Sequence, residues 1–295
     1  MAKIAVGLQH ALERRKAEGQ PGRVTPRIIA RGDGWTVADV MCTSGPQDRP
    51  FEEQHRHHSI AIVLAGSFQY RSQMGRVLLT PGSLMLGNGG QCYECGHEHG
   101  EGDRCVSFWY APEYFERLAA DAGCKGDGAS FTVPRVSPLR SLAPLVARAA
   151  AGVIESENVP WEELGVRLAT LAIRLAAGGS SPQSHAVPNA EARVTRTVRM
   201  IDRNPDARLT LRGMAREAGL SPYHFLRTFE HVTGVTPHQY VLRARLREAA
   251  IRLASGRDKV LDIALDSGFG DVSNFNRAFR TEFGVSPRRY RQPSR

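Results

Sequence analysis

Cysteine and histidine side chains are concentrated in the segment CYECGHEHGEGDRC, residues 92–105. Zinc and other transition metals accept thiolate and imidazole ligands in mixed sets of this kind. In a β-strand, however, neighbouring side chains point to opposite faces, so adjacent donors do not all reach one ion. The candidate ligands in this segment are Cys92, Cys95, His97, His99 and Cys105.

Three further histidines, His55, His57 and His58, lie just before the apolar stretch SIAIVLAG. Together with the cysteine-rich segment they leave three interpretations open. The first is the rim of an effector pocket or a turn held by local hydrogen bonds, the second is a zinc or other transition-metal site, and the third is a thiol-based redox sensor. We favour the first and expect no cofactor. Cys42 and Cys124 stand apart in the sequence and are expected to be buried or unreactive.

A second group of residues with chemical potential lies in an internal repeat in the last third of the chain. Residues 215–240 align with residues 264–290 at eight matched positions, including paired Phe, Arg, Gly, Pro and Tyr residues. Each copy is predicted to fold as helix, turn and helix. Gly219 and Gly268 permit the turn after the first helix, and Ser221 and Asp271 are suited to cap the second.

The phenylalanines that lie four residues apart in each second helix are predicted to face the core. The residues between them are then predicted to face outward, where amide, hydroxyl and guanidinium groups can read base edges in the major groove of DNA. These outward residues are Tyr223, His224, Leu226, Arg227 and Thr228 in the first copy, and Ser273, Asn274, Asn276, Arg277 and Arg280 in the second.

A helix is predicted over residues 237–255, between the two copies. At 1.5 Å per residue it spans roughly 28 Å, and one turn of B-DNA is about 34 Å. The connector is therefore long enough to hold two recognition helices near successive major grooves. We expect its arginines to strengthen the electrostatic attraction to DNA and some of them to reach phosphate. They are Arg243, Arg245, Arg247 and Arg252.

The distribution of charge supports a polyanion partner for this region. Residues 1–190 carry 19 basic and 19 acidic side chains, whereas residues 191–295 carry 20 basic and 11 acidic ones. The whole formal net charge of +9 therefore lies in the last third of the chain, which is typical of a nucleic-acid-binding module joined to a neutral one.

Residues 262–291, DIALDSGFGDVSNFNRAFRTEFGVSPRRYR, closely match the signature of the AraC/XylS family of transcription regulators, and residues 191–291 resemble its DNA-binding domain. The resemblance implies two helix-turn-helix units bridged by a long helix, binding to promoter DNA and contact with RNA polymerase. It favours an activator. The base-contacting positions carry over to Tyr223, His224, Leu226 and Arg227, and to Ser273, Asn274 and Arg277. Leu226 departs from the polar residue often found there, so we expect it to contact a thymine methyl group or a sugar.

The chain is predicted to be an α+β multidomain protein. Residues 24–110 contain short β-type segments separated by turns such as Thr80-Pro81-Gly82, and helices are predicted at 112–122, 138–153 and 160–177. We expect a sensor and dimerisation domain over residues 1–177, a Gly/Ser/Pro-rich linker over 178–190, and an all-α DNA-binding domain over 191–295. The last N-terminal helix carries a seam of Leu164, Leu168, Leu171 and Leu175, which suits either core packing or the interface of a homodimer.

The N-terminal β region resembles the cupin-like sensor domain that is common in AraC-type regulators, and it is expected to be a β-barrel or sandwich with flanking helices. His-x-His before a strand, Gly66 and the Thr-Pro-Gly turn carry this resemblance, which implies a small-molecule effector. A cupin metal site usually adds a glutamate shortly after the histidines. Residues 59–63 contain none, which argues against the alternative of a cupin dioxygenase with an added DNA-binding module.

No stretch approaches the roughly 18 apolar residues of a membrane span, and the N-terminus lacks the features of a secretory signal. We therefore expect a cytoplasmic protein without membrane contact. The sequence predicts a regulator rather than an enzyme. Its expected partners are double-stranded promoter DNA, a small-molecule effector, RNA polymerase and a second copy of the chain.

Overall fold

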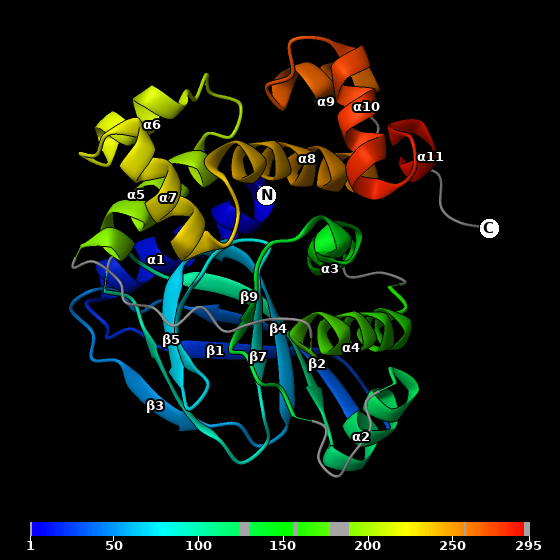
Figure 1. Ribbon diagram of the computed structural model, residues 1–295. Coiled ribbons are helices and arrows are strands. Elements are labelled where there is room, and N and C mark those ends of the chain that lie inside the picture. The colour runs from blue at the N-terminus through cyan, green and yellow to red at the C-terminus, as the bar shows by residue number, and fades with distance from the viewer. Residues whose placement is uncertain are drawn as a thin grey trace.

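Two antiparallel sheets form the N-terminal part of the molecule (Figure 1). The computed structural model describes residues 2–98, 100–123, 130–155, 159–177, 189–256 and 258–291. The first sheet has the spatial order β1 (Val24–Gly32), β2 (Trp35–Cys42), β9 (Asp103–Tyr110), β4 (His58–Gly66), β7 (Leu84–Gly87) and β10 (Arg135–Val136). The second has the order β3 (Phe51–Gln54), β8 (Cys92–Gly96), β5 (Phe68–Ser72) and β6 (Gly75–Leu79).

Strand β4 shows why the sequence folds into layers. Its apolar residues are continuous because both faces of the strand are buried. Ile60 and Ile62 face the layer of helices, while Ala61 and Val63 face the second sheet. The two sheets are separate, so the sandwich form of the predicted fold is confirmed and a closed barrel is not formed.

Helices cover the outer face of the first sheet. They are α1 (Ala2–Glu18), α2 (Pro112–Asp121), α3 (Ala143–Glu155) and α4 (Trp161–Ala177), with a short 3₁₀ turn at Arg140–Leu142 before α3. Ile4 and Leu8 of α1 are buried in this core, as the helical spacing predicts. Leu164 and Leu168 of α4 are also buried there, and Leu171 and Leu175 pack against it, so the leucine seam serves the core of its own chain.

Seven helices form the remainder of the described chain. They are α5 (Ala190–Arg203), α6 (Leu211–Glu217), α7 (Pro222–Thr233), α8 (Pro237–Ser255), α9 (Val260–Asp266), α10 (Val272–Phe283) and α11 (Pro287–Arg291). Helix α8 runs between the two repeat copies, with α7 near one end and α10 near the other (Figure 1). The predicted linker lies almost wholly outside the described residues. No helix among those described is long and apolar enough to cross a bilayer.

Helix α3 packs directly on α8, which joins the β-rich part to the helical part. Ala143 and Ala147 of α3 share a buried cluster with Leu246, Ala249 and Ala250 of α8. Small side chains on both helices allow this close approach. The position of the helix-turn-helix units relative to the sandwich is thus set by a packed interface.

Candidate functional site

Local capping fixes the start and end of helix α7. The Ser221 hydroxyl accepts a hydrogen bond from the His224 amide at 3.3 Å, and Pro222 occupies the first turn. Gly234 ends the helix with a φ of 78°, a conformation that favours glycine. Phe225 and Phe229 are fully buried, as predicted from their spacing.

Helix α10 repeats this construction. The Asp271 carboxylate accepts a hydrogen bond from the Asn274 amide at 2.7 Å, and Gly284 ends the helix with a φ of 77°. Phe275 and Phe279 are fully buried and lie 5.5 Å apart between ring centroids. The repeated signals in the sequence therefore produce two helices with the same buried side.

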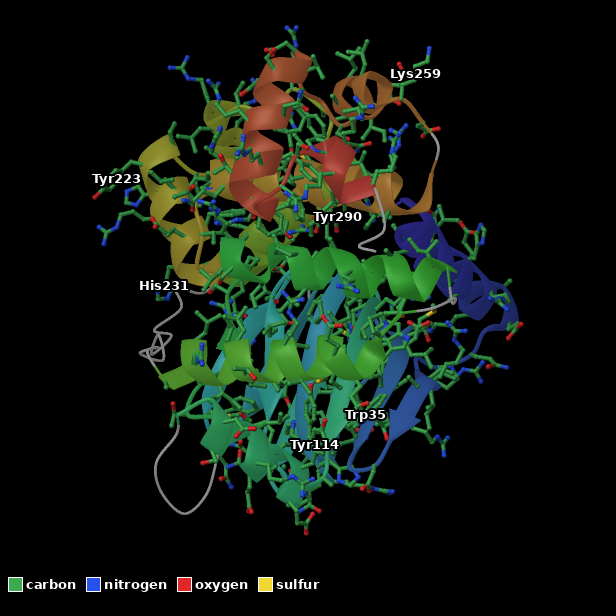
Figure 2. All side chains as sticks on the ribbon, turned by 90° about the vertical axis from the view of Figure 1, so that its right-hand side faces the viewer. Trp35, Tyr114, Tyr223, His231, Lys259 and Tyr290 are labelled. Atoms are coloured by element: carbon green, nitrogen blue, oxygen red, sulfur yellow. The ribbon has the colours of Figure 1, made fainter. Side chains whose placement is uncertain are left out.

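The buried phenylalanines turn the polar side of each helix to solvent. Tyr223 is 63% exposed and projects away from α7 (Figure 2). Of the other six candidate base-contacting residues, His224, Arg227, Ser273, Asn274 and Arg277 are exposed, and Leu226 is half-buried.

In each helix one arginine already has a neighbour that orients it. The guanidinium of Arg227 donates to the Tyr223 hydroxyl at 3.3 Å, and that of Arg277 donates to the Asn274 side-chain oxygen at 3.2 Å. These contacts hold planar donor groups on the surface, where they are able to make paired hydrogen bonds to guanine.

The arginines of the connector behave differently from the sequence expectation. Arg245 donates to the carbonyls of Pro205, Ala207 and Gly268. The other three also use their guanidinium groups within the protein: Arg243 with Pro138 and Glu282, Arg247 with Asp202, and Arg252 with Asp258 and Asp266. These guanidinium groups are engaged within the helical domain and, at Pro138, with the N-terminal part, so the predicted contact of some of them with phosphate requires these bonds to break.

His55 is a buried residue of the sandwich interior. Its Nε2 lies 2.9 Å from the Tyr70 hydroxyl and its Nδ1 lies 3.1 Å from the Ser59 hydroxyl, while Tyr93 stacks on the ring at 4.0 Å. Burial, reinforced by the charge of His58, lowers the pKa of His55 to about 4. The imidazole is therefore neutral at pH 7, and both nitrogens are already used.

The other two predicted histidines of this group have separate surroundings. His57 is exposed. His58 is half-buried and stacks on Phe115 of α2 at 4.3 Å, and burial lowers its pKa. The three histidines therefore do not converge on one point.

The cysteine-rich segment is also divided by the fold. Cys92 is exposed at the start of β8, whereas Cys95, His97 and Cys105 are buried, so the predicted set does not form one cluster. His99 and Cys124 lie outside the described residues. Cys42, expected to stand alone, is instead gathered with His97 and Asp103, and their ligand atoms lie within 4.8 Å of one another.

Hydrogen bonds organise this buried group. His97 Nε2 lies 2.8 Å from Asp103 Oδ2, and the Cys105 thiol lies 3.3 Å from Asp103 Oδ1. Burial by itself lowers the pKa of His97, but the hydrogen bond of Asp103 and the nearby Asp103 and Cys42 side chains raise it to about 9. Burial and the nearby Asp103 carboxylate raise the thiol pKa values of Cys95 and Cys105 well above the usual range. As free thiols these two are poor nucleophiles.

Sequence reasoning missed Cys42 and Asp103 because strand pairing, not proximity in the chain, brings them together. Cys42 of β2 is opposite Asp103 of β9 in the antiparallel register. Asp103 and Cys105 are two residues apart and so share one face of β9. No signal in the linear spacing predicts this pairing.

A cleft of about 940 Å³ lies between the two parts of the molecule. Helix α1 and the end of β4 form one side, and helices α5, α8 and α9 contribute to the other. Acidic residues outnumber basic ones around it. The charged lining consists of Glu13, Glu101, Asp202, Asp206, Glu248 and Asp266, with Lys16, Arg199 and Arg203.

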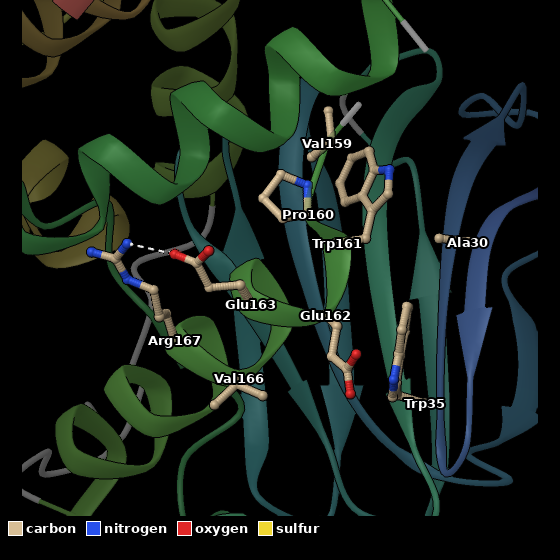
Figure 3. Close-up of a pocket in the computed structure, with 9 residues that line it drawn as sticks. All are labelled: Ala30, Trp35, Val159, Pro160, Trp161, Glu162, Glu163, Val166 and Arg167. Atoms are coloured by element: carbon tan, nitrogen blue, oxygen red, sulfur yellow. Dashed lines mark hydrogen bonds and ion pairs between the residues drawn. The ribbon is translucent and has the colours of Figure 1, made fainter. Parts of the chain in front are cut away.

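A second hollow of about 720 Å³ belongs to the N-terminal part alone (Figure 3). Trp35 and Trp161 line it, and an ion pair between Glu163 and Arg167, with 3.2 Å between nitrogen and oxygen, lies at its edge. Its position away from α5 to α11 distinguishes it from the cleft between the two parts.

Comparison with known proteins identifies the helical part. Residues 214–293 match the model of a helix-turn-helix domain family. Regulatory protein SoxS of Salmonella typhimurium is 34% identical over 94 residues, which is 32% of this chain and 88% of that protein. The HTH-type transcriptional activator RhaS of Klebsiella pneumoniae is 26% identical over 259 residues, covering 84% of this chain and 89% of that one.

Among solved structures, fatty-acid-bound ToxT from Vibrio cholerae aligns over 89% of this chain and 96% of its own, at 13% identity and a TM-score of 0.37. SoxS and RhaS are both named as regulators, and these matches indicate no enzyme family. Residues 214–293, which match the helix-turn-helix family model, contain the repeated units with their buried phenylalanines and outward polar faces. The chain therefore belongs to the AraC/XylS family of DNA-binding transcription regulators.

Proposed function

We propose that the chain binds double-stranded promoter DNA by inserting α7 and α10 into successive major grooves. The observation that carries this proposal is the placement of two exposed polar helix faces near opposite ends of one continuous 19-residue helix, α8. At 1.5 Å per residue α8 is roughly 28 Å long, close to the 34 Å of one DNA turn. The base-reading residues are Tyr223, His224, Leu226, Arg227, Ser273, Asn274 and Arg277.

In this proposal the phosphate groups are contacted by arginines that are exposed in the structure. Arg280 lies on α10, and Arg288 and Arg289 lie on α11 directly after it. Such contacts fix the register of the protein on DNA without reading sequence. Leu226 has no hydrogen-bonding group and supplies apolar contact, as to a thymine methyl group.

The cleft between the two parts is the proposed site of a small-molecule effector. A ligand there touches both parts, so its affinity differs between arrangements of the two and it shifts their populations. The tryptophan-lined hollow of Figure 3 is a weaker candidate because a ligand bound there contacts the N-terminal part only.

We also propose that the protein acts in the cytoplasm as a homodimeric activator that contacts RNA polymerase. The name of RhaS supports activation. Among the described residues strand β1 is at the edge of its sheet and exposes Ile28 (47%), and we propose this edge as the surface that a second copy contacts. Size-exclusion chromatography with light scattering measures the mass, and Ile28→Lys is expected to shift a dimer toward monomer.

Selection of genomic DNA fragments by the purified full-length protein tests the central proposal. At low salt we expect enrichment of a two-part motif with elements about one helical turn apart, and weaker retention at higher salt. Arg277→Ala is expected to relax the preference at one base pair of one element, while Arg174→Ala, at an exposed position of α4, serves as the control. Equal retention of all fragments by protein and variant, across candidate effectors, would contradict the proposal.

A further inference from the structure

The buried group formed by Cys42, His97 and Asp103 has the composition of a metal site. The three side chains come from the end of β2, the residue directly after β8 and the start of β9, and each is at least 95% buried. Their ligand atoms lie within 4.8 Å of one another. Ligand atoms around tetrahedral zinc are roughly 3.3–3.8 Å apart, so small side-chain rotations bring the three to bonding distance.

A second observation shows that the group is incomplete as a hydrogen-bonded cluster. His97 Nδ1 is buried and has no hydrogen-bond partner within the part of the chain that the structure describes. Buried polar atoms are normally paired, and an unpaired one calls for an explanation such as an ion. The other nitrogen, Nε2, lies 2.8 Å from Asp103 Oδ2, and Asp103 gives up this hydrogen bond when it binds the ion as a ligand.

We propose that this group binds one divalent transition-metal ion of the zinc type. One thiolate and one carboxylate balance the charge of a divalent ion, which suits a site without solvent. Thiolate and imidazole ligands select zinc-type ions over calcium and magnesium, which prefer oxygen.

The group of Cys42, His97 and Asp103 borders a loop that contacts the helical domain. The segment between His97 and Asp103 connects the two sheets. Arg199 of α5 donates to the carbonyl of Glu101 at 3.1 Å, and its guanidinium is pressed against Gly100, where a Cβ would collide with it. Arg76 of β6 adds ion pairs to Glu98 and to Glu191 of α5.

Metal binding and domain docking are therefore coupled through this loop. An ion that ties His97 and Asp103 to Cys42 fixes both ends of the segment on which Arg199 docks. Ligands that prefer one of two arrangements influence each other's affinity reciprocally. This coupling rests on the proposed DNA binding, whereas the metal site does not.

The site itself is tested with metal alone. Full-length protein treated with chelator and dialysed is titrated with Co²⁺ and with Zn²⁺, and bound metal is measured by elemental analysis. We expect one equivalent per chain and the visible absorption of tetrahedral, thiolate-bound Co²⁺. Cys42→Ser and His97→Gln are expected to lose it, while the exposed Cys92→Ser retains it. Circular dichroism confirms that each variant is folded.

If a variant does not fold, metal binding by the wild-type protein still tests whether the site exists. A Co²⁺ spectrum without thiolate bands, or no bound metal, overturns the proposal. Retained binding in folded Cys42→Ser overturns the ligand assignment, as does loss of binding in Cys92→Ser. A Cys42–Cys95 disulfide found by mass spectrometry, with no metal bound, assigns the group to thiol chemistry instead.

The coupling has its own measurement. DNA affinity of wild-type protein is compared with and without one equivalent of Zn²⁺, and we expect a change of at least about fivefold. Arg199→Met is expected to bind metal normally and to lose this dependence, whereas Arg203→Met, an exposed neighbour on α5, keeps it. Metal stoichiometry of one with DNA affinity unaffected refutes the coupling but not the site. Absent DNA binding in every condition refutes the proposed function instead.

Discussion

Replacing Arg243 of the connector helix separates a structural role from a DNA-binding role. Its guanidinium donates to the Pro138 carbonyl at 2.6 Å, and its Nε lies 3.3 Å from Glu282 Oε1. The Arg243 and Glu282 side chains are only 15% and 7% exposed. Arg243→Ala therefore leaves a buried carboxylate of α10 without its cation and removes a bond between the two parts of the molecule.

The magnitude follows from this burial. Removing one partner of a buried ion pair costs about 3–5 kcal/mol. The Nε–Oε1 contact is an ion pair without hydrogen-bond geometry, so we take the lower end and expect Arg243→Ala to reduce the free energy of unfolding by about 3 kcal/mol. Urea unfolding followed by circular dichroism measures the change, with Arg174→Ala as the surface control.

DNA binding provides the opposing test. A lost phosphate contact lowers the dependence of log affinity on log salt by about one. Because Arg243 is engaged inside the protein, we expect the salt dependence of Arg243→Ala to equal that of the wild type under conditions where both are folded. A reduced slope together with unchanged stability would refute the structural role and restore the phosphate contact that the sequence suggested.

Three further changes test other parts of the molecule. Arg277→Ala is expected to weaken specific DNA binding by about 1–3 kcal/mol and to relax preference at one base pair. Competition with single-base variants of the selected motif measures this, and unchanged preference would show that α10 does not read this base pair. Phe279→Ala empties a fully buried position in contact with the rings of Phe275, Phe283 and Tyr290, and calorimetry should show a loss of about 3–5 kcal/mol. Asp39→Asn should cost about 3 kcal/mol near pH 7, because the carboxylate accepts two hydrogen bonds from Arg104 and one from Arg27.

The pH dependence of the Asp39 variant follows from the direction of its pKa shift. Burial by itself raises the pKa of Asp39, but hydrogen bonds and charge from Arg104 and Arg27 hold it below its ordinary value of 3.8. The ionised form is thus favoured in the folded protein, and its contribution is complete above 3.8 and is lost as pH falls through the folded pKa. The stability gap between wild type and Asp39→Asn should close in acid, and a gap that widens there would contradict the assignment.

The sequence was sufficient to predict features that depend on neighbouring residues. Capping residues, glycines and the four-residue spacing of phenylalanines predicted α7 and α10 and the side of each helix that is buried, and α8 has the predicted bounds. These features follow from helical periodicity and from backbone hydrogen bonds that close within a few residues. Short β-type segments likewise predicted a β-barrel or sandwich, and the tertiary structure decided between them by forming two separate sheets.

The contacts of side chains whose partners are distant in the sequence were determined by the tertiary structure. The connector arginines look free in the sequence, yet their donors contact Pro138, Asp202, Glu282 and other groups that lie 6 to 105 residues away.

Cys42 looks isolated, yet the register of β2 and β9 places it opposite Asp103 and next to His97. Composition and spacing determined the DNA-binding helices because their signals are local. The buried ligand group and the contacts between the two parts depend on which strands pair and which helices pack, and only the folded chain determines that.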